Sequence, residues 1–306
     1  MRIVFMGTPD YAAVTLQKLI DEKYDIAAVF AQPDKPVGRK QVLTPPPTKV
    51  LAQQNNIPVY QPKTLRDGEA FGILNDINPE VIVVVAYGKI LPKEILDLPK
   101  YGCINGHASL LPKLRGASPI QWAIVTGESK TGVSTMLMDE GMDTGDILDT
   151  AVTDIGEQET AEELFERLSE ISANLMVSTL EGLKNGTVTP KKQDETAATY
   201  APIIKKEMAH IDFNKTADEI CNAVRGYYSW PCAFCILDGK RLKVMSAIPA
   251  EGNGNIGEVI DNTNSLKVAC KDGAVEFLTV QLEGSKAMRA CDMLRGKGIA
   301  LGTVLV

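Results

Sequence analysis

Val81-Ile82-Val83-Val84-Val85 is an uninterrupted run of β-branched residues that ends in Ala86-Tyr87-Gly88. A strand that is apolar at every position has both faces buried, as the central strands of a parallel sheet do. A second apolar run, Arg2-Ile3-Val4-Phe5-Met6, is followed by a helical pattern and by another strand over residues 26–31. The chain therefore begins β-α-β, and these stretches predict an α/β fold with a doubly wound, mostly parallel sheet.

The turn after the first strand argues against the binding of a dinucleotide. The dinucleotide fingerprint G-x-G-x-x-G needs three glycines at this turn, and only Gly7 is present. A nucleotide-dependent oxidoreductase is therefore disfavoured. Ligands are still expected at the carboxyl ends of the strands, where they gather in open α/β sheets.

The length of 306 residues predicts two domains rather than one core. Thr160-Ala161-Glu162-Glu163 is a capping box that opens a long helix, and helical periodicity is lost after residue 185. Short apolar runs separated by polar turns occupy residues 233–281, which is typical of a small barrel of the OB type. We expect a first domain over residues 1–188, a basic linker over 189–206 and a second domain over 207–306.

Composition excludes several classes of protein. With 44% hydrophobic and 23% charged residues and no long apolar run, the chain is typical of a soluble globular protein without a membrane span. The N-terminus carries no signal-peptide pattern, so a cytoplasmic location is expected. The net charge of −7 argues against indiscriminate nucleic-acid binding, although residues 208–306 are neutral.

One of only two histidines lies in Cys103-Ile104-Asn105-Gly106-His107-Ala108-Ser109-Leu110-Leu111-Pro112. Residues 104–108 are predicted to form a strand, so Asn105 and His107 point to the same face, about 6–7 Å apart along the backbone. The amide supplies N–H donors, and the imidazole can donate or accept a proton near neutral pH. This pair suits a carbonyl whose oxygen becomes negative during attack.

A polar turn follows in Met138-Asp139-Glu140-Gly141-Met142-Asp143-Thr144-Gly145-Asp146. A carboxylate from this turn can orient the imidazole and favour its charged form. Aspartates at this spacing more often cap turns, and an isolated Asn-x-His is more often a buried structural pair. Taken singly, each pattern leaves both interpretations open.

Together, Asn-x-His-x-Ser-Leu-Leu-Pro, Arg-Gly-Ala-x-Pro-Ile and Met-Asp-x-Gly-Met-Asp-Thr-Gly-Asp resemble the folate-dependent formyltransferases. Over nearly its whole length the chain is similar to the branch of that family that acts on methionyl-tRNA. The resemblance implies that Asn105, His107 and Asp143 are catalytic. It implies that tetrahydrofolate is bound by Ser109, Leu110, Leu111, Pro112, Tyr87, Gly88, Met138 and Asp139.

The same resemblance implies the reaction and its partners. The formyl donor would be 10-formyltetrahydrofolate, the acceptor would be the amine of initiator methionyl-tRNA, and neither a metal nor a membrane would be needed. The product would serve translation initiation, and a monomer is expected. The OB-like second domain would help to bind tRNA.

A basic, proline-rich stretch over residues 32–47 is expected to be an irregular, exposed loop. Its charge alone is equally consistent with a solvated connection. By resemblance it enters the acceptor arm of the tRNA, with Arg39 and then Lys40 as the contact residues. In the linker, Lys191, Lys192, Lys205 and Lys206 are candidates for further phosphate contacts, although a lysine-bearing linker is normally only solvated.

Two features depart from the simplest interpretation. Gly106 stands where the family usually has a larger apolar residue, and a consequence for packing but not for chemistry is expected. Cys232 and Cys235 form a C-x-x-C without a second pair of ligands, so they are expected to be reduced packing residues rather than a metal site.

Other functions within and outside the family remain open at this point. A sugar-nucleotide or glycinamide-ribonucleotide formyltransferase would share the chemistry, and the basic loop and second domain favour tRNA over these. A formyltetrahydrofolate hydrolase would have a similar triad. A non-enzymatic RNA-binding protein is disfavoured because it would not need Asn105, His107 and Asp143 together.

Overall fold

The computed structural model describes residues 1–38, 40–296 and 298–306. These residues form two compact units, which are described separately. Unit 1 comprises Met1–Gly116, Thr131–Asp154 and Phe165–Tyr200, and unit 2 comprises Ala117–Lys130, Ile155–Leu164 and Ala201–Val306. The domain bounds 1–188, 189–206 and 207–306 stay a prediction.

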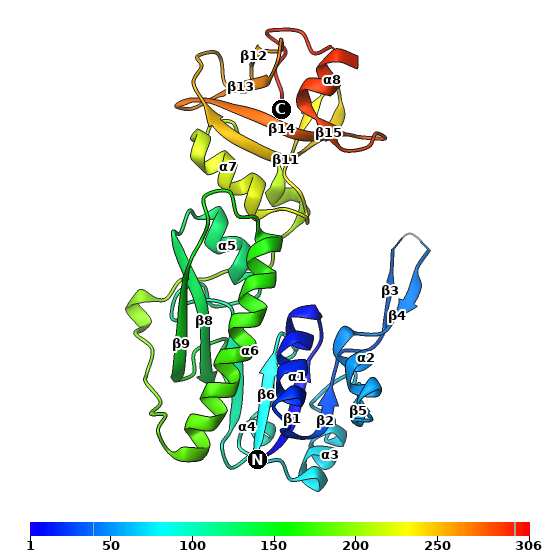
Figure 1. Cartoon of the computed structure of the whole chain (residues 1–306), viewed down its shortest axis with the longest axis vertical. Coiled ribbons are helices and arrows are strands. Elements are labelled where there is room, and N and C mark those ends of the chain that lie inside the picture. The colour runs from blue at the N-terminus through cyan, green and yellow to red at the C-terminus, as the bar shows by residue number, and fades with distance from the viewer. Residues whose placement is uncertain (39, 297) are drawn as a thin grey trace. The chain divides into compact units, whose positions relative to one another are not determined.

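Unit 1 is built on a seven-stranded sheet in the order β5-β2-β1-β6-β7-β8-β9. Strands β5, β2, β1, β6 and β7 pair in parallel, and β8 is antiparallel to β7. The predicted doubly wound, mostly parallel sheet is confirmed (Figure 1). The strands are β1 (Arg2–Gly7), β2 (Asp25–Phe30), β5 (Val59–Tyr60), β6 (Val81–Val85), β7 (Cys103–His107), β8 (Lys130–Leu137) and β9 (Ile147–Asp154).

Every residue of β6 is buried, as its uninterrupted apolar sequence predicts. On one face, Ile82 and Val84 share an apolar cluster with Leu74 and Ile95, which lie on two helices. On another side of unit 1, the Tyr11 ring packs edge-on against Phe165, with 5.3 Å between ring centroids. The helices are α1 (Asp10–Asp21), α2 (Pro47–Gln54), α3 (Glu69–Ile77), α4 (Lys93–Leu96) and the long α6 (Ala161–Asn185).

The start of α6 confirms the predicted capping box. The backbone N–H of Glu163 donates to the Thr160 hydroxyl oxygen at 3.3 Å, and the backbone N–H of Thr160 donates to the Glu163 carboxylate at 2.9 Å. Two backbone donors that the helix itself leaves free are thus satisfied.

The proline-rich stretch over residues 32–47 is not the irregular loop that was expected. Residues Lys35–Val37 (β3) and Val42–Thr44 (β4) pair as an antiparallel hairpin that projects from unit 1 (Figure 1). The prediction was wrong because a two-stranded ribbon consists only of edge strands, where a proline such as Pro36 can lie with no ladder bond lost.

Unit 2 contains a six-stranded sheet in the order β10-β11-β14-β13-β12, with β15 pairing with β14. The strand pairs among its described residues are all antiparallel. Its strands are β10 (Phe234–Leu237), β11 (Lys240–Ala250), β12 (Val259–Asp261), β13 (Leu266–Cys270), β14 (Gly273–Leu282) and β15 (Met288–Arg289). The helices are α5 (Pro119–Val125), α7 (Ala217–Gly226), α8 (Ala290–Gly296) and the 3-10 turn η2 (Lys206–Ala209).

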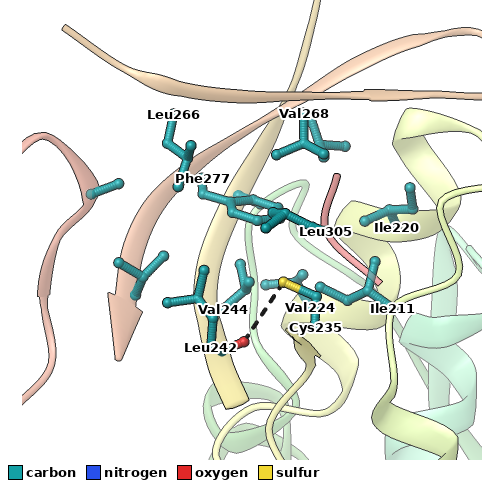
Figure 2. Packing of buried hydrophobic residues seen from close by; sticks show 14 of the residues in the cluster. Ile211, Ile220, Val224, Cys235, Leu242, Val244, Leu266, Val268, Phe277 and Leu305 are labelled. Carbon is teal, nitrogen blue, oxygen red and sulfur yellow. Dashed lines mark hydrogen bonds between the residues drawn. The ribbon is translucent and has the colours of Figure 1, made fainter. Parts of the chain in front are cut away.

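The core of unit 2 fills the space between this sheet and α7. Figure 2 shows Phe277 of β14 at its centre, near Leu305 and Ile220. Cys235 is fully buried there, and its thiol donates to the Leu242 carbonyl at 3.9 Å. Cys232 is also buried and free, so both thiols of the C-x-x-C are packing residues in this structure.

Candidate active site

Strand β7 carries two of the three predicted catalytic residues into one place. It lies between β6 and β8, with Asn105 opposite Met136 and His107 opposite Ser134. The side-chain amide of Asn105 lies 3.4 Å from Asp143 Oδ1, and His107 Nδ1 lies 3.7 Å from Asp143 Oδ2. The structure therefore brings Asn105, His107 and Asp143 together, although 38 positions separate Asn105 from Asp143.

The contacts of the His107 ring assign its proton positions. Nε2 lies 2.9 Å from the Leu114 carbonyl oxygen. Because a carbonyl oxygen only accepts hydrogen bonds, Nε2 must carry the donated hydrogen. Nδ1 is therefore the ring nitrogen left to face Asp143. Asp143 Oδ2 lies 3.7 Å from this nitrogen, and the ring is only 6% exposed.

Asp143 is held in a backbone conformation that side chains seldom adopt. Its φ is 55°, in the left-handed region, so the surrounding contacts must fix it. Its Oδ2 accepts the backbone N–H of Gly116 at 2.8 Å. Its own carbonyl oxygen accepts the side-chain N–H of Gln193 at 2.8 Å. The position of the carboxylate therefore depends on the loop after β7 and on Gln193.

Sequence reasoning missed the buried guanidinium of Arg115, which lies in that loop and is 0% exposed. It binds both oxygens of Glu195, at 2.8 and 2.9 Å, and also the Gln193 side-chain oxygen. Glu195 raises the pKa of Arg115, and Arg115 lowers the pKa of Glu195. The motif Arg-Gly-Ala-x-Pro-Ile begins at Arg115 but gives no indication that its side chain is buried, and the non-periodic linker offers no signal for its partners.

The predicted folate-binding segment Ser109–Pro112 follows β7 directly. Ser109 is buried, and its hydroxyl donates to the Lys113 carbonyl at 2.6 Å. The Ser134 hydroxyl donates to the Ser109 carbonyl at 2.8 Å and accepts the Leu111 N–H at 3.1 Å. Strand β8 thus fixes the backbone of this segment beside His107.

Tyr87 and Gly88 form the turn at the carboxyl end of β6. The Tyr87 carbonyl accepts the Gln32 side-chain N–H at 3.0 Å and the Thr8 hydroxyl at 3.3 Å, which ties this turn to the ends of β2 and β1. Gly88 has a φ of 78°, which favours glycine. The Tyr87 ring is buried, and burial raises the pKa of its hydroxyl to about 12.

Met138 and Asp139 open the turn that carries Asp143. The Met138 N–H donates to the Cys103 carbonyl at 2.8 Å, so this residue extends the pairing of β8 with β7. Asp139 Oδ1 accepts the Thr144 hydroxyl at 2.6 Å and the Gly141 N–H at 3.0 Å. The Asp139 carboxylate therefore stabilises the turn by binding two residues within it.

Of the two predicted tRNA contacts, Lys40 lies in the turn between β3 and β4, apart from the group around His107. Arg39 lies outside the described residues, and Lys40 is exposed. At the base of the hairpin, Lys49 Nζ lies 2.8 Å from both Asp34 Oδ1 and Gln61 Oε1. Lys49 and Gln61 hold the pKa of the Asp34 carboxyl below its usual range.

The described residues (1–38, 40–296 and 298–306) contain no group of three or more His, Cys, Asp or Glu side chains that would hold a metal ion. None of their helices is long and apolar enough to cross a membrane.

Two family models match the chain. A model described as formyl transferase matches residues 1–180, and one described as formyl transferase, C-terminal domain matches residues 203–298. A methionyl-tRNA formyltransferase of Geotalea uraniireducens (strain Rf4) is 49% identical over 306 residues, which cover 100% of this chain and 98% of that protein.

Solved structures share the fold at lower identity. Methionyl-tRNA formyltransferase from Clostridium thermocellum superposes with a TM-score of 0.59 at 24% identity, covering 92% of this chain and 98% of that one. HypX from Aquifex aeolicus in complex with tetrahydrofolic acid has a TM-score of 0.62 at 18% identity, covering 98% of this chain and 48% of that one. Both family models and the full-length identity show that this chain belongs to the formyl transferase family, in its methionyl-tRNA formyltransferase branch.

Proposed function

We propose that this chain transfers the formyl group of 10-formyltetrahydrofolate to the free amine of initiator methionyl-tRNA. The observation that carries the proposal is the convergence of Asn105 and His107 on Asp143, at 3.4 and 3.7 Å. Full-length similarity to a methionyl-tRNA formyltransferase supports the choice of acceptor. The product would be formylmethionyl-tRNA.

Asn105 and His107 would stabilise the formyl oxygen, which gains negative charge as the amine attacks the carbonyl carbon. The Asn105 amide has two N–H groups, and its 3.4 Å contact with Asp143 occupies one of them. A preorganised donor of this kind acts where charge develops in the transition state. Positioning and charge stabilisation would therefore carry the catalysis.

His107 and Asp143 would handle the proton that the attacking amine loses. The attacking amine must be neutral, and it loses a proton as the new C–N bond forms. Nδ1 of His107 is the site at which the ring holds or releases a proton, since Nε2 is committed to the Leu114 carbonyl. The Asp143 carboxylate stabilises the charged ring and can accept the amine proton through water.

One structural observation bears on a polar group beside β6. The Tyr87 hydroxyl is buried and has no hydrogen-bond partner among the described residues. A buried polar atom normally has a hydrogen-bond partner, so a bound group with a polar edge would supply one. The folate supplies the activated formyl group. We propose that Tyr87, Gly88, Ser109–Pro112, Met138 and Asp139 hold it.

The proposal for tRNA rests on charge and on chain organisation. Arg39 and Lys40 lie between the two strands of the projecting hairpin, and Lys191 and Lys192 lie in the segment after α6. Phosphate contacts depend on such local basic groups rather than on the net charge. We propose that these residues and the OB-like domain over 207–306 bind the acceptor arm, and that the enzyme is a cytoplasmic monomer.

The test measures formyl transfer from 10-formyltetrahydrofolate to initiator methionyl-tRNA. The wild type is expected to transfer, and His107→Ala to lose kcat by about 100- to 10,000-fold, the range of general acid–base effects. Arg39→Ala with Lys40→Ala should instead raise KM for tRNA. Lys18→Ala, which removes a half-buried lysine of α1 paired with Glu22 just past the helix end, is the charge control.

Outcomes other than these identify the alternatives. Formate release without transfer to any amine would indicate a hydrolase. Formylation of an amino sugar nucleotide or of glycinamide ribonucleotide, with none of tRNA, would keep the triad and reject the acceptor. Either result would overturn the proposed function.

A further inference from the structure

We propose that Gln193 is a positioning residue for the His107–Asp143 pair, and this inference rests on the function proposed above. Gln193 lies in the non-periodic segment after α6, where the sequence predicts only a basic linker. Its side chain is half-buried and makes hydrogen bonds with two separate parts of the active site. Its role follows from what these two parts hold.

On its donor side, Gln193 fixes the turn that carries Asp143. Nε2 donates to the carbonyl oxygen of Asp143 at 2.8 Å and to that of Gly145 at 2.7 Å. These two carbonyls lie on either side of Thr144, the residue after Asp143. Asp143 itself has its φ in the left-handed region. A conformation of this kind persists only when the surroundings over-determine it, and Gln193 supplies two of the bonds that do so.

The side-chain oxygen of Gln193 binds the loop after β7. This atom, Oε1, accepts from Arg115 Nε at 3.1 Å and from Nη2 at 2.8 Å. The neighbours of Arg115 in the chain make the two key contacts of the site. The Leu114 carbonyl binds His107 Nε2 at 2.9 Å, and the Gly116 N–H binds Asp143 Oδ2 at 2.8 Å.

One amide thus joins the loop that orients His107 to the turn that presents Asp143. Only a side chain with a donor and an acceptor on the same planar group fits both neighbours. The guanidinium of Arg115 can only donate, and the carbonyl oxygens of Asp143 and Gly145 can only accept, so the partners themselves assign the amide orientation. A glutamate keeps the bond to Arg115 and loses both donors to the turn.

This difference separates positioning from a merely structural role. If Gln193 only satisfies the buried guanidinium, Gln193→Glu should be nearly as active as the wild type. If Gln193 positions Asp143, the carboxylate of Gln193→Glu faces two carbonyl oxygens, the turn moves, and kcat falls. A misplacement of about 1 Å costs on the order of 100-fold in rate.

The experiment compares the wild type with Gln193→Glu, Gln193→Ala and Gln17→Ala. Gln17 is the matched control, since it is an exposed amide on α1 that donates only to Asp21, at 2.7 Å. We expect kcat for formyl transfer to fall about 10- to 100-fold in both Gln193 variants, with KM for the folate and for tRNA changed by less than about threefold. Gln17→Ala should match the wild type.

A second measurement does not need turnover. The chain has only two histidines, so the imidazole NMR signals of His107 and His210 can be assigned with a His210→Gln variant. Displacement of Asp143 in Gln193→Glu should shift the His107 signals. The His210 signals should stay, because that ring stacks on Phe234 in unit 2.

The outcomes separate the two proposals. A wild type that forms no formylmethionyl-tRNA, while Gln193→Glu still shifts the His107 signals, overturns the function and keeps the positioning role. An active wild type with Gln193→Glu of equal kcat and unchanged His107 signals overturns the positioning role. If Gln193→Ala does not fold, Gln193→Glu decides the question alone.

Discussion

His107 Nδ1 faces Asp143 Oδ2 at 3.7 Å, while the opposite ring nitrogen is bound to a backbone carbonyl. The Nε2 hydrogen is therefore held by the backbone, and Nδ1 is the ring nitrogen beside the carboxylate. The separation is longer than an ordinary hydrogen bond, as is common in an active site without its substrate. Asp143 therefore faces the ring through its charge, while its hydrogen bonds go to Gly116 and Asn105.

The first prediction concerns that charge. Asp143→Asn keeps the size of the side chain and an oxygen that can accept from Gly116, but it removes the stabilisation of a charged His107 ring. We expect kcat to fall about 100- to 10,000-fold, with KM for tRNA and the unfolding midpoint almost unchanged. Asp149→Asn, at an exposed position on β9, is the control. Equal activity of the two variants would remove Asp143 from the mechanism.

The second prediction concerns the pH dependence of stability. Glu195 has a lowered pKa because it binds Arg115, so its contribution is complete above the unfolded pKa of about 4.3 and is lost as the pH falls through the folded value. Glu195→Gln should unfold at a lower urea concentration than the wild type at pH 7. The gap between the two urea midpoints should narrow as the pH falls below the unfolded pKa and through the folded one. A gap that stays constant over this range would contradict the ion pair.

The parts of the fold that depend on local pattern were predictable. Strand β6 follows from its unbroken apolar run, and the shared face of Asn105 and His107 follows from the two-residue period of β7. The capping box at Thr160 is likewise a local signal. In each case the residues that decide the structure lie within a few positions of one another.

The parts of the fold and site that depend on distant contacts were not predictable from the sequence. Arg115 binds Gln193, which is 78 positions away in the sequence, and Glu195, which is 80 positions away. No local pattern predicts such pairs. The β3–β4 hairpin was missed for a different reason, because its prolines exclude a sheet interior but are compatible with an isolated ribbon. The approach of Asp143 to His107 was expected from family resemblance rather than from spacing.

The third prediction concerns thiol reactivity. Cys235 is 0% exposed, and burial raises its pKa to about 12, so little thiolate forms at pH 8. We expect alkylation by iodoacetamide to be slower in the folded protein than in urea by on the order of 100-fold. Cys291, which is half-buried, should react faster. Mass spectrometry of the labelled peptides measures both rates, and equal labelling would refute the packing role.

The last prediction concerns Gly106, which lies between Asn105 and His107 but faces the other way. A Cβ at this position would lie 3.0 Å from Ser172 Oγ and 3.4 Å from Met176 Cε, both on α6. In Gly106→Ala, the entropic gain from removing a strand glycine, about 0.5–1 kcal/mol, opposes this tight contact. The free energy of unfolding should therefore change by less than about 1 kcal/mol, and kcat should be unaltered.

Gly132→Ala in β8 provides the contrast for this prediction. A Cβ there would lie 2.0 Å from the Ala151 carbonyl oxygen, which is backbone and cannot give way cheaply. This variant should be destabilised by about 1–3 kcal/mol or more, measured by urea unfolding beside Gly106→Ala. A tenfold loss of kcat in Gly106→Ala with normal stability would mean that the α6 face of β7 also sets the Asn105–His107 geometry. An unchanged kcat would limit the role of Gly106 to packing.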